Sequence, residues 1–137
     1  MKRMLLLLLI VLFFPVLCMG ESAIQSEGNM SYIITSEGAV IIDWNNQLPD
    51  VLDATLYVPP TLGGIPVVGI GFDAFDTCNE GPSTQFQLIL PEGITFLEKG
   101  AFQCCNQATV ISLPSTLETI PEGSFIHVKA KIVFPNG

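Results

Sequence analysis

The side chains that could carry out covalent chemistry in this chain are few, and they lie near its C-terminal end. The only histidine, His127, follows Ser124 by three residues, so serine hydrolysis would require these two groups to meet an acid. Cys104 and Cys105 could instead supply a thiol nucleophile beside the same histidine. However, Ser124 and Cys105 each fill a position of a pattern that recurs along the chain, and packing explains such positions better than catalysis does. We therefore expect no enzyme activity.

Residues with the usual spacing of metal ligands are also missing from the sequence. There is no C-x-x-C pair and no second histidine, so no zinc site is predicted. Asp73, Asp76 and Glu80 lack the alternating pattern of a calcium loop, which favours a solvated acidic edge. Gly63-Gly64 is typical of a turn and not of a phosphate-binding loop. We expect no metal and no cofactor.

The charge of the chain argues against partners that carry many phosphates. Asp and Glu number 13 against 5 Lys and Arg in 137 residues, and Lys2 and Arg3 both stand at the N-terminus. The chain after residue 20 therefore has three basic and thirteen acidic residues, a formal charge of −10. Such a surface cannot neutralise nucleic acid or an anionic membrane. The length fits one domain.

The first twenty residues have the form of a secretory signal. A basic start precedes an apolar run over residues 4–19, and Cys18 and Gly20 stand at positions −3 and −1 of a cut after residue 20. The run is shorter than the roughly 20 residues that span a membrane. A lipid anchor at Cys18 would require a small residue where Leu17 stands. We expect residues 1–20 to be a signal peptide and the protein to be secreted, extracellular or at the cell surface.

A short pattern recurs four times after residue 53. Each copy has the form apolar–x–apolar–proline, and the copies are Leu56-Tyr57-Val58-Pro59, Leu88-Ile89-Leu90-Pro91, Ile111-Ser112-Leu113-Pro114 and Ile132-Val133-Phe134-Pro135. The last three prolines are 23 and 21 residues apart. Because the alternation has period two, each triplet predicts a short strand with its outer members buried, and the proline ends the strand.

An aromatic column accompanies the triplets. Phe75, Phe102 and Phe125 each follow a small residue and are expected to stack between neighbouring repeats. One unit of this size cannot bury its apolar face alone, whereas stacked units can. The sequence therefore predicts a mainly β solenoid with coils of about 23 residues.

The segments over residues 66–78 and 90–105 resemble the leucine-rich repeat of the BspA type. In that family isoleucine-proline is followed by a turn, a V-x-x-I-G element, alanine-phenylalanine and a cysteine. The last repeat departs from the pattern, since Ser124 replaces the alanine and Val128 the cysteine. The resemblance implies a curved solenoid of a bacterial or protozoal surface or secreted protein, linked to adhesion and protein binding.

The chain before the repeats is expected to cap the first coil. Residues 32–35 and 39–44 flank a three-residue turn, so residues 31–53 are predicted to form a β-hairpin cap and a loop. Residues 21–30 are polar and are expected to be flexible. Residues 54–137 would form three to four leucine-rich coils with no evident C-terminal cap, and self-association through the open C-terminal coil is expected.

The cysteines after the signal allow one internal bridge at most. Cys78, Cys104 and Cys105 are an odd number, so they do not form a disulfide framework. Cys78 and Cys105 each follow a column phenylalanine by three residues, and neighbouring coils place such positions about 5 Å apart. A disulfide between Cys78 and Cys105 is one hypothesis, and two buried thiols are the other.

The outward positions of the predicted strands make a candidate partner-binding strip. Its members are Thr55, Tyr57, Gln87, Ile89, Val110, Ser112, Lys131 and Val133. A weakly polar strip of this kind suits a protein partner. We therefore expect a secreted or cell-surface binding module for protein–protein interaction or adhesion, with an extracellular protein or glycan as its ligand. The alternative is a structural spacer or truncated repeat fragment without a partner, whose strip a neighbouring domain covers.

Overall fold

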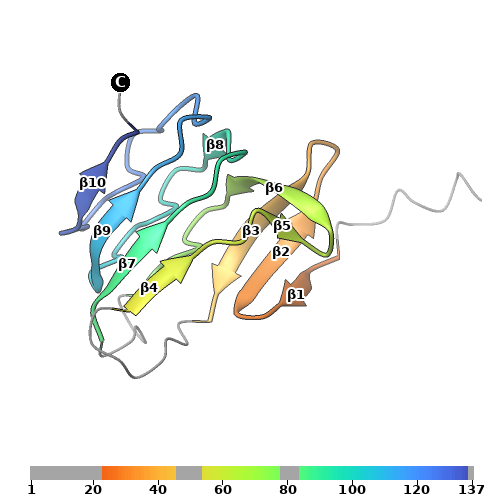
Figure 1. Cartoon of the computed structure of the whole chain (residues 1–137). Helices are drawn as coiled ribbons and strands as arrows, with labels where there is room; N and C mark the ends of the chain where they lie inside the picture. Colours follow the sequence, from red (N-terminus) through yellow and green to blue (C-terminus); the bar gives the residue numbers. More distant parts are fainter. Residues whose placement is uncertain (1–22, 46–53, 78–83, 136–137) are drawn as a thin grey trace, which may run out of the picture.

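Two ladders of short parallel strands form the body of the molecule (Figure 1). The computed structural model describes residues 23–45, 54–77 and 84–135, and the predicted signal peptide over residues 1–20 lies outside these ranges. The described residues contain no helix, hence none that is long and apolar enough to cross a membrane. The predicted mainly β class is confirmed.

The first ladder carries the triplets of the sequence pattern. It consists of β4 (Ala54–Tyr57), β7 (Phe86–Ile89), β9 (Ala108–Ser112) and β10 (Lys131–Val133). The strands pair in parallel in the order β10-β9-β7-β4 and lie side by side along one face of the molecule (Figure 1). Each strand ends two residues before its proline, because proline fixes φ and has no amide hydrogen for the ladder.

The second ladder is made by one strand from the chain before the triplets and by the segments that follow the triplets. Its strands β3 (Ala39–Trp44), β6 (Ile65–Ile70) and β8 (Phe96–Leu97) pair in parallel, and a bridge from Phe96 to Thr119 continues the ladder into the next coil. Strand β5 (Thr61–Leu62) forms a hairpin with β6, which accounts for the greater length of the first coil. Gly69 of β6 admits the Phe96 ring, since a Cβ at Gly69 would lie 2.2 Å from that ring.

The N-terminal cap has three antiparallel strands. The predicted hairpin is present as β2 (Met30–Ile34) and β3, and β3 also joins the second ladder beside β6. Residues 21–30 were expected to be flexible, and this expectation is wrong for Gln25–Glu27, which form β1 and pair with β2. The pairing of Glu27 with Met30 leaves Gly28 and Asn29 as a two-residue turn, with Gly28 at a φ of 57°.

A column of stacked aromatic rings runs through the core. The ring centroids of Phe75 and Phe102 are 5.4 Å apart, and those of Phe102 and Phe125 are 5.3 Å apart with nearly parallel planes. The predicted phenylalanine stack is therefore confirmed. Trp44 of the cap continues it, 5.8 Å from Phe75, and also meets Phe86 at 5.1 Å. The column thus begins in the cap and passes through every aromatic turn.

Backbone hydrogen bonds join the aromatic turns to one another. The N–H of Phe75 donates to the carbonyl of Ala101 at 3.2 Å, and the N–H of Phe102 donates to the carbonyl of Ser124 at 3.0 Å. The residue two before each phenylalanine has a positive φ, with 54° at Asp73, 79° at Gly100 and 89° at Gly123. Glycine adopts this conformation without a steric cost, and aspartate is one of the few other residues that tolerate it.

Candidate functional site

The eight residues of the predicted strip lie in two straight rows across the first ladder. Parallel pairing aligns Thr55 with Gln87, Gln87 with Val110, and Val110 with Lys131, which makes the first row. The second row is formed in the same way by Tyr57, Ile89, Ser112 and Val133. The register therefore brings together all eight side chains, although they are spread over 79 positions of the sequence.

Burial follows the alternation that defines the strip. Leu88 and Ile111 are fully buried, whereas the strip residues beside them in sequence are exposed or half-buried. Tyr57 is 67% exposed and has the largest exposed aromatic ring on this ladder. Alternation places successive side chains on opposite faces of a strand, so the core face and the strip are two sides of the same strands.

The two rows differ in chemistry. The first row is mostly polar, with Thr55, Gln87 and Lys131 exposed. The second row is mostly apolar, because Tyr57, Ile89 and Val133 stand in it around Ser112. A partner on this face would therefore meet a polar edge and an apolar edge about 7 Å apart, the spacing of alternate residues in a strand.

A hollow of about 300 Å³ adjoins the strip at Tyr57. It lies between the β1–β2 turn and the end of β4, and its lining comprises Glu27, Gly28, Asn29, Met30, Leu56, Tyr57, Pro59 and Leu62. Sequence reasoning missed this hollow because it assigned no structure to the residues of β1. The signal that could have found it is the pair Gly28-Asn29, a frequent two-residue hairpin turn.

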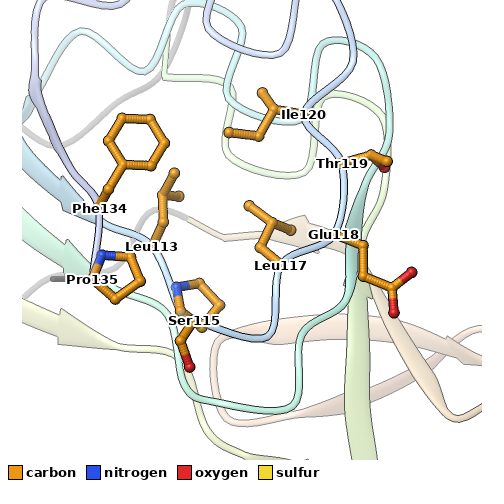
Figure 2. A pocket seen from close by; sticks show the side chains of 9 residues that line it. Leu113, Ser115, Leu117, Glu118, Thr119, Ile120, Phe134 and Pro135 are labelled. Carbon is orange, nitrogen blue, oxygen red and sulfur yellow. The ribbon is translucent and has the colours of Figure 1, made fainter. Parts of the chain in front are cut away.

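A second hollow, of about 390 Å³, opens at the far end of the solenoid. Figure 2 shows Leu113, Leu117, Ile120 and Phe134 around it, all from the last turns of the chain. Phe134 is 60% exposed and Ile120 is 41% exposed. Their counterparts in the preceding coil, Leu97 and Leu113, are 3% and 5% exposed, so these two side chains are the ones that no later coil covers within the part of the chain that the structure describes.

Of the two hypotheses for Cys78 and Cys105, the disulfide between them is contradicted, because Cys105 is a free thiol. Cys105 is a free thiol with no exposed surface, and burial raises its pKa to about 12. Its neighbour Cys104 is the disulfide-bonded residue. The side chain of Cys105 is buried in the core, so a shared column does not place it where it can form a bridge. Cys78 lies outside the described residues.

Ser124 and His127, the serine and histidine considered for hydrolysis, lie in different environments. The hydroxyl of Ser124 is buried and donates to the carbonyl of Pro121 at 2.7 Å, while His127 is exposed. Among the residues that the structure describes, no group of three or more His, Cys, Asp or Glu side chains could hold a metal ion.

Two carboxylates have altered proton affinity. Burial and the nearby charge of Asp76 raise the pKa of Asp73, whose Oδ1 is buried and accepts no hydrogen bond from the described residues. The N–H and hydroxyl of Ser115, at 2.9 and 2.8 Å, lower the pKa of Glu92, and the N–H of Thr116 adds to this effect. Glu92 thereby joins the turn of one coil to the turn of the next.

Three solved structures that are similar to this chain are leucine-rich repeat proteins. The T. pallidum leucine-rich repeat protein TpLRR superimposes with a TM-score of 0.59 and 22% identity, over 75% of this chain and 45% of that one. A leucine-rich cell surface protein of Faecalibacterium prausnitzii gives a TM-score of 0.52 and 20% identity, over 82% and 27%. A leucine-rich repeat protein of Bacteroides capillosus gives 0.52 and 20%, over 85% and 100%.

These likenesses define the fold of the chain. It is a short leucine-rich-repeat solenoid, as the resemblance in the sequence implied. The chain spans less than half the length of the first two of these structures. No family model and no curated protein matches the chain.

Proposed function

We propose that this chain is a secreted or cell-surface binding module that holds a protein partner on the eight-residue strip. The observation that carries the proposal is the pair of aligned rows with Tyr57 exposed at one end. Exposed aromatic and aliphatic side chains in a contiguous patch favour protein contact, and tyrosine is enriched at such contacts. The strip lies on β-strands, so little conformational entropy is lost when a partner binds.

The signal-like residues 1–20 support export, and the description of the F. prausnitzii neighbour as a cell surface protein agrees with a surface location. Adhesion is the finer form of the proposal, in which the partner is fixed to a matrix or to another cell. A strip without a ligand of its own, covered by another domain, is the structural alternative.

The test begins with the full chain produced in a secretory host and purified from the medium. The immobilised protein is exposed to extracellular matrix proteins, mucins and surface polysaccharides. We expect saturable capture of one protein class, and we expect Tyr57→Lys combined with Ile89→Lys to reduce capture at least about tenfold, because a few side chains, tyrosine among the commonest, carry most of the binding energy of an interface. Phe72→Lys is the matched control, since Phe72 is 59% exposed but lies outside the strip.

Three results would count against the proposal of a protein partner on the strip. Capture that survives the double substitution would place the binding surface elsewhere. No capture by a folded monomer would favour the structural spacer, and capture of polysaccharide alone would make the ligand a glycan.

A further inference from the structure

We propose that the hollow beside Tyr57 receives a lysine or arginine side chain of the protein partner. This inference rests on the proposed function and names the chemistry of the partner at one end of the strip. The hollow continues the apolar row, since Tyr57 belongs to both. A segment lying across the strip would therefore reach the hollow at its edge.

The floor and walls of the hollow suit an aliphatic stem. Met30 and Leu62 are 4% and 1% exposed and form buried apolar surface, while Leu56 and Pro59 are half-buried beside them. Lysine and arginine bury their methylene groups on such surface while the charged head stays at the rim.

The rim carries a carboxylate that is held in position. Oε2 of Glu27 accepts a hydrogen bond from the N–H of Gly63 at 2.5 Å, which joins the cap to the β5–β6 turn. Oε1 of Glu27 has no partner among the described residues and can accept from a ligand. The exposed ring of Tyr57 offers a second contact, because a cation is attracted to the face of an aromatic ring.

The charge around the hollow selects a cation. Residues 4–98 include eleven acidic side chains and no lysine, arginine or histidine, so no residue of this segment can serve as a counter-ion for Glu27. The only basic residue of the strip, Lys131, lies on β10 at the opposite edge of the ladder. A positively charged partner would also be steered toward this region by the net negative charge.

A neutral sugar fits the hollow less well. Sugar hydroxyls require several convergent polar side chains, whereas the polar side chains of this lining are those of Glu27, Asn29 and Tyr57 over an apolar floor. The lining therefore favours one charged head group with an apolar stem.

The test uses small probes and the full chain from a secretory host, labelled with ¹⁵N. N-acetylarginine methylamide is titrated while the amide resonances of Gly28, Asn29 and Leu62 are followed. N-acetylcitrulline methylamide, a neutral isostere, is the comparison probe. We expect a saturable shift with the arginine probe and binding at least about threefold weaker with the citrulline probe.

Matched variants separate a local contact from general charge attraction. Glu27→Gln keeps an acceptor for the Gly63 N–H and is expected to weaken arginine binding about threefold. Tyr57→Ala is expected to weaken it about twofold to fivefold. Asp43→Asn removes the same charge from an exposed position on the same cap and is expected to leave binding unchanged. Unchanged emission from Trp44 shows that each variant is folded.

The inference is overturned if the arginine and citrulline probes bind equally well, or if Asp43→Asn weakens binding of the arginine probe as much as Glu27→Gln does. It is also overturned if the amide resonances that shift lie far from the hollow, or if N-acetylglucosamine binds more tightly than the arginine probe. Its failure is distinct from that of the proposed function. If capture of a protein depends on Ile89 and Glu27→Gln captures that protein equally well, the strip is supported as the binding surface and the cation site is contradicted. If the arginine probe binds but no protein is captured, the cation site stands and the proposed function fails.

Discussion

Trp44 and Phe75 pack together with their ring centroids 5.8 Å apart and their planes inclined at 36°. Trp44 belongs to the cap and Phe75 to the first aromatic turn, so this contact joins the cap to the repeat stack. Trp44 is 2% exposed and is the only tryptophan of the chain, which makes its fluorescence a specific reporter of the junction. The cap and coils are therefore expected to unfold together.

Removing this ring should destabilise the whole solenoid. Trp44→Ala is expected to cost about 3–5 kcal/mol of unfolding free energy, because it leaves a cavity between Phe75 and Phe86. Trp44→Phe should cost less, since it keeps a ring and removes an indole N–H that has no partner among the described residues. Urea unfolding followed by circular dichroism measures both. Equal stability of Trp44→Ala and the wild type would contradict the shared core.

The middle of the aromatic column should be equally sensitive. Phe102 is fully buried between Phe75 and Phe125, so Phe102→Ala is expected to lose about 3–5 kcal/mol. Phe72→Ala provides the control, because the exposed ring of Phe72 should contribute within about 0.5 kcal/mol. Similar losses at the two positions would show that the rings do not form a core column.

The thiol of Cys105 should be unreactive in the folded protein. With its pKa raised to about 12, the thiolate fraction at pH 8 is about a thousandfold below that of an ordinary cysteine, and labelling by a disulfide reagent should slow accordingly. Denaturation should restore the rate. Cys105→Ser should also be less stable than Cys105→Ala, because it buries a hydroxyl. Fast labelling without unfolding would contradict the buried position.

Glu92 should add a pH dependence to stability. Its pKa is lower in the folded chain, so its stabilising contribution is fully present above its unfolded pKa and is lost as the pH falls through the folded pKa. Glu92→Gln should therefore reduce stability at pH 7, and the deficit should shrink as the pH falls through the folded pKa of Glu92. Glu37→Gln, on the exposed β2–β3 turn, is the control. A stability deficit of Glu92→Gln that persists at low pH would indicate that the side chain stabilises the fold by packing and not by its charge.

The open end of the solenoid should promote self-association. Ile120, Ile126 and Phe134 are 41%, 42% and 60% exposed, and among the described strands β10 pairs on one side only. We expect a mass that rises with concentration in sedimentation measurements, and a lower mass after Phe134→Lys. A monomer with cooperative unfolding at high temperature would contradict this expectation.

The repeat architecture could be predicted because its determinants are local. One part of a coil is defined by the alternation at Leu88 and Leu90, another by the proline that follows, and a third by the spacing to Phe102. Because the same pattern recurs, these parts can be aligned from one coil to the next. The strip was predicted from the same alternation, since its members are the outward positions of the predicted strands. The role of Trp44 was not predicted, because the aromatic column was recognised from phenylalanines that recur in the repeats, and Trp44 lies before the repeats.

Features that depend on tertiary context were not predictable. Strand β1 is polar and exposed on all three residues, so it has no alternation to indicate a strand, and its pairing with β2 depends on the Gly28-Asn29 turn. The hollow at Glu27 was missed for the same reason. The pairing of Cys105 failed because sequence spacing identifies a column but not whether that column faces the core or the surface.

The most direct test of the account is site-specific photo-crosslinking to the captured partner. The full chain carries benzoylphenylalanine in place of Ile89, or in place of Phe72 as a control of similar chemistry outside the strip. If the strip is the binding surface, we expect a crosslinked product from the Ile89 position and little from the Phe72 position. A crosslink from the Phe72 position alone, with none from the Ile89 position, would contradict the assignment of the strip as the binding surface.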